Sequence, residues 1–258
     1  MIKKYFLLLL ATILLTGVHG QNRQVDLPKN IPLQDILKKA KKQKKHVLLD
    51  FGSPRCSPCL FIKNKIFTID SIADFINERF VSVDYTEGPE KKRLSKIYEV
   101  YTEPVLLICD ANGRVMHRME GKCTAGEMMA RLRQGLDVKN NLTAQKLMYD
   151  NGNRSSEFLI NYLETLHIAG LRTQRDSVLQ NIFSPSFHVD SLKTPKYWNV
   201  FLRYNESPVS REGSYVFKHR EEFYKLFGEQ IVNGKIDRMF NGKLRRFTYG
   251  QTPRFVSI

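Results

Sequence analysis

Cys56 and Cys59 are separated by two residues, a spacing at which two cysteines can form a disulfide that is readily reduced. They follow an apolar run over residues 47–51 and the strand-breaking sequence Gly52-Ser53-Pro54. A strand that leads through a tight turn into a helix places both cysteines at the first helical turn. The unpaired amides and the dipole of that turn favour a thiolate at Cys56. This arrangement predicts thiol–disulfide exchange.

The neighbouring residues supply the rest of the predicted chemistry. We expect Cys56 to be the nucleophile, with the positive charge of Arg55 beside it, and Cys59 to resolve the mixed disulfide. Cys59 must lose a proton to do so. Asp50 lies in the apolar strand beneath, where burial raises the pKa of a carboxyl, and we expect it to accept this proton.

Two other interpretations of the cysteine pair are a structural disulfide and half of a zinc site. No other pair of cysteines or histidines in the sequence has the spacing of metal ligands. We therefore expect no metal and no cofactor other than the redox-active Cys56–Cys59 disulfide itself. Cys109 ends an apolar run and is expected to be a small buried residue.

The elements that position these residues follow from hydrophobic periodicity. Helices are expected over residues 32–45, 57–67, 72–78, 90–100 and 124–136, and strands over 46–51, 80–85, 105–109 and 114–120. This order predicts an α/β fold, in which a small mixed sheet with a parallel pair and an antiparallel hairpin has helices on both faces. In the helix over 57–67 the pattern turns some residues inward (Leu60, Ile62, Ile66 and Phe67) and others to water (Lys63, Asn64 and Lys65).

The hairpin fixes where the fourth cysteine lies. A two-residue turn at Asn112-Gly113 sets Cys109 opposite Met116 and brings Cys123 to the end of the strand that holds Pro104. A disulfide between Cys109 and Cys123 is disfavoured in this register. Cys123 is then either a thiol at the edge of the site or a loop cysteine without a role.

Four motifs together resemble the thioredoxin family, with a similarity that covers about Leu33 to Leu136. They are Asp50-Phe51, Cys56-Ser57-Pro58-Cys59, Glu103-Pro104-Val105 and the turn Asp110 to Gly113. The resemblance implies a thioredoxin-like fold and a thiol–disulfide oxidoreductase that acts on protein thiols or disulfides. It also implies a redox partner that recycles the dithiol, and it places Asp50 where the family has its buried acid.

The resemblance also implies a substrate-binding rim. Pro104 stands at the place of the family's cis-proline, where neighbouring backbone groups bind a substrate strand, and we group Arg55, Glu103 and Gly121 with it. The chain departs from the family in three respects. Arg55 replaces the usual tryptophan, Val105 follows Pro104 in place of the commoner threonine, and residues 80–84 contain no match for the family's lysine near the buried acid.

The N-terminus predicts export. Lys3 and Lys4 precede an apolar run over residues 6–15, and residues 18–20 suit a cleavage site, so residues 1–20 are expected to be a signal peptide. The alternative, a retained anchor, requires a longer apolar run. An exported, lysine-rich chain of this kind resembles thioredoxin-like proteins of the Gram-negative envelope, which places it in the periplasm or cell envelope.

The remaining chain is expected to contain three further parts. Residues 21–30 form a polar and poorly ordered N-terminal segment, residues 31–138 the thioredoxin-like domain, and residues 139–258 an all-α domain of helical hairpins. Helices in the last part are expected near residues 142–149, 156–169, 174–182, 195–204 and 221–233. Its many aromatic residues are expected to form a core, with a partner-binding groove as the alternative.

Charge restricts the partners. The 258 residues contain 41 Lys and Arg against 26 Asp and Glu, a formal net charge of +15, and six lysines fall within residues 38–45. Export argues against nucleic acid as the partner. The lysines form either a solvated helix face or a surface for contact with an anionic partner or membrane. Besides an oxidoreductase, the sequence permits a non-enzymatic binding module or holdase, or an exported protein with a static disulfide.

Overall fold

A computed structural model describes residues 23–248, with side chains up to residue 241. The signal peptide expected over residues 1–20 lies outside these described residues. The chain divides into two compact units, Met1–Leu147 with Ile168–Gly170 and Met148–His167 with Leu171–Ile258. The first unit thus extends past residue 138, where the sequence places the end of the first domain.

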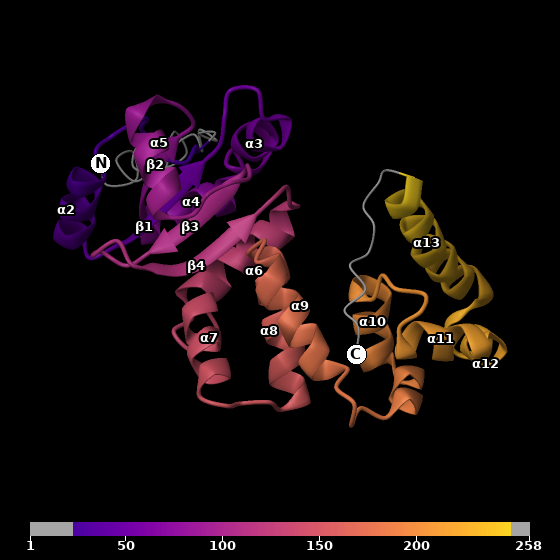
Figure 1. Cartoon of the computed structure of the whole chain (residues 1–258). Helices are drawn as coiled ribbons and strands as arrows, with labels where there is room; N and C mark the ends of the chain where they lie inside the picture. The colour runs from indigo at the N-terminus through magenta and orange to yellow at the C-terminus, as the bar shows by residue number, and fades with distance from the viewer. Residues whose placement is uncertain (1–22, 249–258) are drawn as a thin grey trace, which may run out of the picture. The chain divides into compact units, whose positions relative to one another are not determined.

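The first unit contains the four-stranded sheet that the sequence predicts (Figure 1). Its strands are β1 (His46–Phe51), β2 (Phe80–Tyr85), β3 (Val105–Cys109) and β4 (Val115–Glu120). Their order is β2-β1-β3-β4, in which β1 and β2 are parallel and the other two pairs are antiparallel. The parallel pair and the hairpin are confirmed.

Helices cover both faces of this sheet, as Figure 1 shows. They are α2 (Leu33–Gln43), α3 (Ser57–Phe61), α4 (Asp70–Arg79), α5 (Gly88–Ile97) and α6 (Ala125–Leu136), and α3 continues directly into a π-helical turn, η1 (Ile62–Ile66). The sequence predicts all five helices, but it does not predict the π-helical turn.

Successive side chains of β1 point to opposite faces of the sheet and therefore pack against different helices. Val47, Leu49 and Phe51 belong to a core with residues of α2 and α5. Leu48 belongs to a second core with residues of η1, α4 and α6. Asp50 follows Leu48 at a spacing of two and therefore faces the helix that carries the cysteines.

The segment before α2 is packed onto the sheet. Its backbone pairs with Asp84, whose N–H donates to Pro28 O at 2.9 Å and whose carbonyl accepts from Asn30 N–H at 3.0 Å. Val25 and Leu27 pack against the second core. The expectation of a poorly ordered segment is wrong for residues 23–30, because its few apolar residues and its backbone both find partners.

The hairpin has the predicted register from Val105 to Ile108 and then departs from it. An irregularity between Ile108 and Cys109 sets Cys109 opposite Val115, where the sequence predicts Met116. The turn causes this difference. The carboxylate of Asp110 accepts hydrogen bonds from two backbone amides of the turn, at 2.9 and 3.0 Å, and this closes a wider loop than a two-residue turn.

The rest of the chain is helical, and among the described residues no strand follows β4. The elements are α7 (Leu142–Asp150), α8 (Ser156–Ile168), α9 (Arg172–Ile182), the 3-10 helix η2 (Val189–Lys193), α10 (Pro195–Tyr204), α11 (Arg211–Lys218), α12 (Arg220–Phe227) and α13 (Glu229–Thr248). The single helix expected near residues 221–233 is wrong. Gly228 adopts a φ of +88°, which ends α12 before α13 begins.

The second unit has an aromatic core of its own. The ring of Trp198 stacks on Phe227 at 4.7 Å and contacts Phe201 and Phe223 at 5.4 and 5.2 Å. Lys235 of α13 is also buried and donates to Leu202 O at the end of α10, at 2.9 Å. The expectation that most of these aromatic residues form a core is confirmed for this group. Within residues 23–248, no helix has both the length and the apolar character that a bilayer crossing requires.

Two glycines of α6 provide a matched test of how this helix packs on the sheet. A methyl group at Gly135 would overlap Ile108 Cδ1 and approach His117 Cβ to 3.2 Å, whereas one at Gly126 meets no atom within 4 Å. We expect Gly135→Ala to lower the free energy of unfolding by about 1–3 kcal/mol. Gly126→Ala should leave it unchanged or raise it by up to about 1 kcal/mol. Urea unfolding of both variants checks this, and equal effects would contradict the packing.

Candidate redox site

Cys56 and Cys59 are joined by a disulfide at the start of α3. Cys56 occupies the N-cap position, and its Sγ accepts a hydrogen bond from Cys59 N–H at 3.1 Å. Cys59 is only 2% exposed, whereas Cys56 is partly exposed. Cys56 is therefore the sulfur that an incoming thiol can reach, and the same amide would stabilise its thiolate after reduction.

Asp50 lies beneath the cysteine helix and is 2% exposed. Its burial raises the pKa to about 6, an effect that Lys63 opposes and the neighbouring Asp84 reinforces. Asp50 Oδ2 is buried and has no hydrogen-bond partner among the described residues. A buried carboxylate oxygen without a hydrogen bond favours the protonated acid, so Asp50 can take up a proton near neutral pH.

Lys63, in η1, is the cation of the site. Its Nζ donates to Asp84 Oδ2 at 2.7 Å and to Thr86 Oγ1 at 2.6 Å. Nζ also lies 3.4 Å from Asp50 Oδ2, a distance at which it is an ion-pair neighbour of Asp50 and not a strong hydrogen-bond donor to it. Two buried carboxylates thus share one ammonium group.

These contacts correct the helix faces expected from the sequence. The Lys63 side chain is only 19% exposed, although we expected it to face water, and Leu60 is 44% exposed, although we expected it to face inward. Cys59 and Lys63 are four residues apart and share one side of the helix. Because buried Cys59 turns that side toward the sheet, Leu60 turns to solvent.

The sequence contains a signal for this cluster that its apolar patterning alone does not reveal. Asp84 is an acid near the end of the otherwise largely apolar strand β2, just as Asp50 is in β1, and the two residues are direct partners in the parallel pair. Strand β2 itself contains no lysine. Two buried acids side by side require a cation from some element, and Lys63 supplies it from the helix.

The opposite rim of the site is formed by the loop before β3. The Glu103–Pro104 peptide bond is cis. The Glu103 carboxylate pairs with Lys91 Nζ of α5 at 2.6 Å. Partial burial alone would raise the pKa of Glu103, but hydrogen bonds from Lys91 and Ser53 outweigh it and hold the pKa below its usual value. Glu103 is therefore an anion beside the cysteine pair.

The other residues expected at the rim also gather here. Gly121 N–H donates to Pro104 O at 3.0 Å, which ties the end of β4 to the proline loop. Arg55 is exposed next to Cys56. Beyond Gly121, Lys122 Nζ lies 3.9 Å from the ring centre of Phe61. This contact holds the loop after β4 against α3.

The remaining two cysteines are free thiols in buried places. Cys109 is fully buried, as expected, and burial raises its pKa to about 12. Cys123 is 5% exposed, and burial raises its pKa as well. Cys123 is therefore not the accessible thiol at the edge of the site that one interpretation expected.

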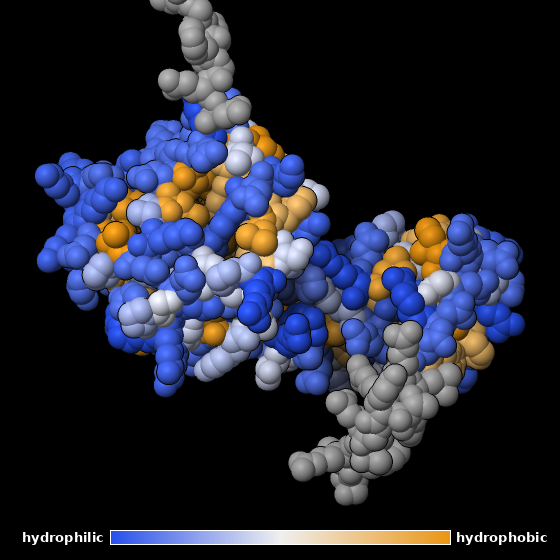
Figure 2. Space-filling view, turned by 90° about the horizontal axis from the view of Figure 1, so that it is seen from above, coloured by the Kyte–Doolittle hydropathy of each residue, from blue (hydrophilic) through white to orange (hydrophobic). Residues whose placement is uncertain are grey.

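Exposed apolar side chains occur on the elements next to the cysteines. Leu60 of α3, Ile97 of α5 and Tyr101 in the loop before Glu103 are 44%, 58% and 83% exposed. Figure 2 looks down on the end of the first unit that carries α3 and α5, and it shows hydrophobic residues in patches between hydrophilic ones. Such patches suit contact with a protein substrate.

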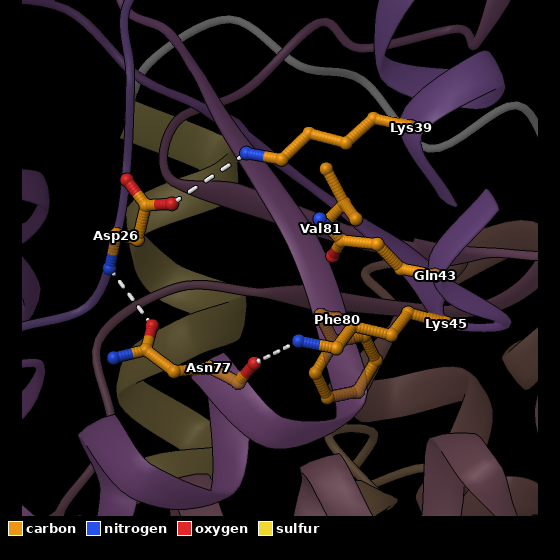
Figure 3. Close-up of a pocket in the computed structure, with 7 residues that line it drawn as sticks. All are labelled: Asp26, Lys39, Gln43, Lys45, Asn77, Phe80 and Val81. Carbon is orange, nitrogen blue, oxygen red and sulfur yellow. Dashed lines mark hydrogen bonds and ion pairs between the residues drawn. The ribbon is translucent and has the colours of Figure 1, made fainter. Parts of the chain in front are cut away.

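A cavity of about 280 Å³ lies at the other end of the sheet, near the start of β2 (Figure 3). Its two lysines already have partners. Lys39 pairs with Asp26 at 3.7 Å, and Lys45 Nζ donates to Asn77 O at 2.7 Å. Since β1 runs from this end toward the cysteines, the cavity is remote from the disulfide, and its polar groups hold the N-terminal segment.

Comparison with known proteins identifies the first unit. The family described as thioredoxin-like domain matches residues 33–136, almost the range over which the sequence resembles thioredoxins. Residues 33–136 are a thioredoxin-like domain. No curated protein matches the chain.

Several solved structures are similar to the chain. A candidate disulphide isomerase from Bacteroides thetaiotaomicron has 24% identity and a TM-score of 0.40, over 45% of this chain and 97% of that one. A thioredoxin from Thermus thermophilus has 21% identity and a TM-score of 0.40, over 46% and 93%. The oxidised C-terminal domain of DsbD from Neisseria meningitidis has 22% identity and a TM-score of 0.35, over 39% and 90%. We infer no activity from these similarities.

The raised pKa of Asp50 predicts that the free energy of unfolding depends on pH. Between its ordinary value of 3.8 and about 6, the folded thioredoxin-like domain binds a proton that the unfolded chain has lost, so stability falls as the pH rises through this window. Asp50→Asn removes this loss. We expect the oxidised variant to be more stable than wild type by roughly 1–3 kcal/mol at pH 8 and equal to it below pH 4. Denaturant unfolding against pH tests this, with exposed Asp35→Asn as the control, and a pH-independent difference would contradict it.

Lys63 is expected to have the opposite effect. Lys63→Met leaves the carboxylates of Asp50 and Asp84 buried without a cation, which should cost about 3–5 kcal/mol at pH 8. The loss should shrink below pH 6 as Asp50 becomes protonated, and the pKa of Asp50 should rise because Lys63 no longer lowers it. Lys65→Met is the control, since Lys65 lies on the same helical segment and is exposed. Similar unfolding curves for the two variants would contradict the shared ion pair.

Proposed function

We propose that this protein is a thiol–disulfide oxidoreductase that acts on protein thiols and disulfides through Cys56 and Cys59. One observation carries the proposal: a partly exposed sulfur and a buried sulfur form a disulfide at the start of a helical segment whose Lys63 contacts Asp50, a buried carboxyl with a raised pKa. A static cross-link needs neither the difference in exposure nor the acid beneath. The rim at Pro104 provides the open side at which a substrate segment can lie.

The reaction begins with the reduced protein. The Cys56 thiolate attacks a substrate disulfide, so that a Cys56–substrate disulfide forms and one substrate thiolate leaves. Cys59 then gives its proton to Asp50 and attacks Cys56 Sγ. This step forms the Cys56–Cys59 disulfide and releases the second substrate sulfur as a thiolate, which takes a proton. Two electrons have passed from the dithiol to the substrate, and the same steps in reverse oxidise a dithiol substrate.

Lys63 and Asp84 set how readily Asp50 exchanges its proton. Burial raises the pKa of Asp50 to about 6, while the ammonium of Lys63 favours the anion and the neighbouring carboxylate of Asp84 disfavours it. A group with a pKa near neutrality can both accept the proton of Cys59 and return it in the reverse reaction. We assign Lys63 and Asp84 as positioning residues for this transfer.

The wider setting follows from the same proposal. The expected signal peptide supports a location outside the cytoplasm, in the periplasm or cell envelope, where disulfides persist. A second protein would recycle the dithiol after each turnover. The exposed apolar residues near α3 and the lysines of α2 provide surfaces for protein substrates and for an anionic partner.

Insulin reduction tests the proposal. Wild-type protein should accelerate the precipitation of insulin by dithiothreitol, and Cys56→Ser should abolish the acceleration. Cys59→Ser should accumulate mixed disulfides with substrate proteins, because the first attack proceeds and the resolving step does not. The double variant Cys56→Ser/Cys59→Ser is the matched control and should trap none. Asp50→Asn should slow the resolving step by roughly 100-fold at pH 7.

The alternatives predict different results. A static disulfide would give no insulin reduction and would resist dithiothreitol. A binding module or holdase would bind unfolded proteins equally well with and without Cys56. Either result would overturn the proposal.

A further inference from the structure

Glu103 brings a third ligand atom to the cysteine pair. Its carboxylate oxygen and the sulfurs of Cys56 and Cys59 all lie within 4.8 Å of one another. The sulfurs come from the start of α3, whereas Glu103 comes from the loop before β3, more than forty residues along the chain. In the sequence, the two cysteines provide only two ligands and no second ligand pair is visible. The fold brings Glu103 to them as a third ligand.

The donor set suits a zinc ion. Zinc binds thiolate sulfur at about 2.3 Å and carboxylate oxygen at about 2.0–2.2 Å, and tetrahedral geometry then sets the ligand atoms roughly 3.5–3.8 Å apart. Once the disulfide is open, the sulfurs must separate from 2.06 Å to about this spacing, and the Glu103 oxygen already lies within 4.8 Å of both. Two sulfurs and one oxygen suit zinc better than magnesium or calcium, which prefer oxygen alone.

We propose that the reduced protein binds Zn²⁺ through Cys56, Cys59 and Glu103. The proposal rests on the proposed function only in requiring that the disulfide can be reduced. Zn²⁺ binds both sulfurs as thiolates, so the proton of Cys59, and that of any Cys56 still protonated, leaves as the ion enters, without any change of oxidation state. Water fills the fourth position, since the site is open to solvent at Glu103.

Lys91 limits the strength of this site. Its ammonium pairs with one oxygen of the Glu103 carboxylate at 2.6 Å and would repel a bound cation. Ser53 also donates a hydrogen bond to this carboxylate and would compete with the ion for it. Removal of the Lys91 charge should therefore tighten binding, whereas removal of the Glu103 charge should weaken it.

Bound zinc would hold the protein in an inactive form. Both sulfurs are occupied in the complex, so Cys56 cannot attack a disulfide until the ion leaves. The oxidised protein has no thiolate at this place and should not bind the ion. The reduced protein would thus be protected from oxidation and held in reserve wherever zinc is abundant.

The test measures zinc affinity of the full chain with Zn²⁺ alone, by competition with a chromophoric chelator under anaerobic conditions. Reduced wild type should bind one ion, and the oxidised protein none. Glu103→Gln should weaken binding at least about 10-fold, and exposed Glu87→Gln should not change it. Lys91→Met should strengthen binding several-fold relative to exposed Lys92→Met. With Co²⁺ as a probe, sulfur-to-metal charge-transfer absorption should appear in the reduced protein and disappear in Cys56→Ser.

Two results would overturn the zinc site: equal affinity of wild type and Glu103→Gln, or binding that persists in the oxidised protein. Neither depends on turnover. Insulin reduction measured with a strong chelator tests the oxidoreductase by itself. If the protein reduces insulin but its zinc affinity does not depend on Glu103, only the metal-site proposal fails. If it does not reduce insulin but binds zinc through Glu103, only the proposed enzyme activity fails.

Discussion

The arrangement of the thioredoxin-like domain around its disulfide depends on one ammonium group shared by two buried carboxylates. Asp50 and Asp84 are neighbours across β1 and β2 and face the same helix. Two buried anions at such a distance would repel each other strongly without compensation. Lys63 provides the compensation, and it does so from the segment that begins with the cysteines, so the ion pair also fixes how that segment lies on the sheet.

The net charge of this cluster determines how readily Asp50 takes up a proton. With both carboxylates ionised, the cluster carries one net negative charge, and a proton on Asp50 makes it neutral. A buried cluster favours the neutral state, which is the physical basis of the raised pKa of Asp50. In the proposed mechanism, Asp50 accepts the proton that Cys59 loses, and this makes the buried cluster neutral.

The sequence could reveal the sheet and the cysteines because their signals are local. Each strand is a short apolar run, Cys56 and Cys59 are close in sequence, and the hairpin register follows from one turn as far as Ile108. It could not reveal which side of a helix faces the sheet when a candidate side carries both polar and apolar residues. Lys63 has the pattern of an exposed residue, and only the pairing of Asp50 with Asp84 shows why it is buried.

Two further features of the structure could not be predicted from the sequence, for related reasons. The shift at Cys109 results from the hydrogen bonds of a single carboxylate, Asp110, which local propensity does not resolve. Glu103 approaches the cysteines only because α3 and the loop before β3 meet at one end of the sheet. Contacts between residues so far apart in sequence depend on the whole topology, and the proximity of Glu103 to the sulfurs is therefore a property of the fold.

The two acids near the cysteine helix differ in charge. Burial raises the pKa of Asp50, whereas Glu103 remains an anion because Lys91 and Ser53 hold its pKa down. An anion near Cys56 opposes the thiolate that Arg55 and the Cys59 amide favour, and a less stable thiolate makes the disulfide form relatively more stable. Lys91 neutralises part of that effect. The open rim therefore adjusts the redox balance through charge, where a tryptophan in place of Arg55 would have acted through apolar contact.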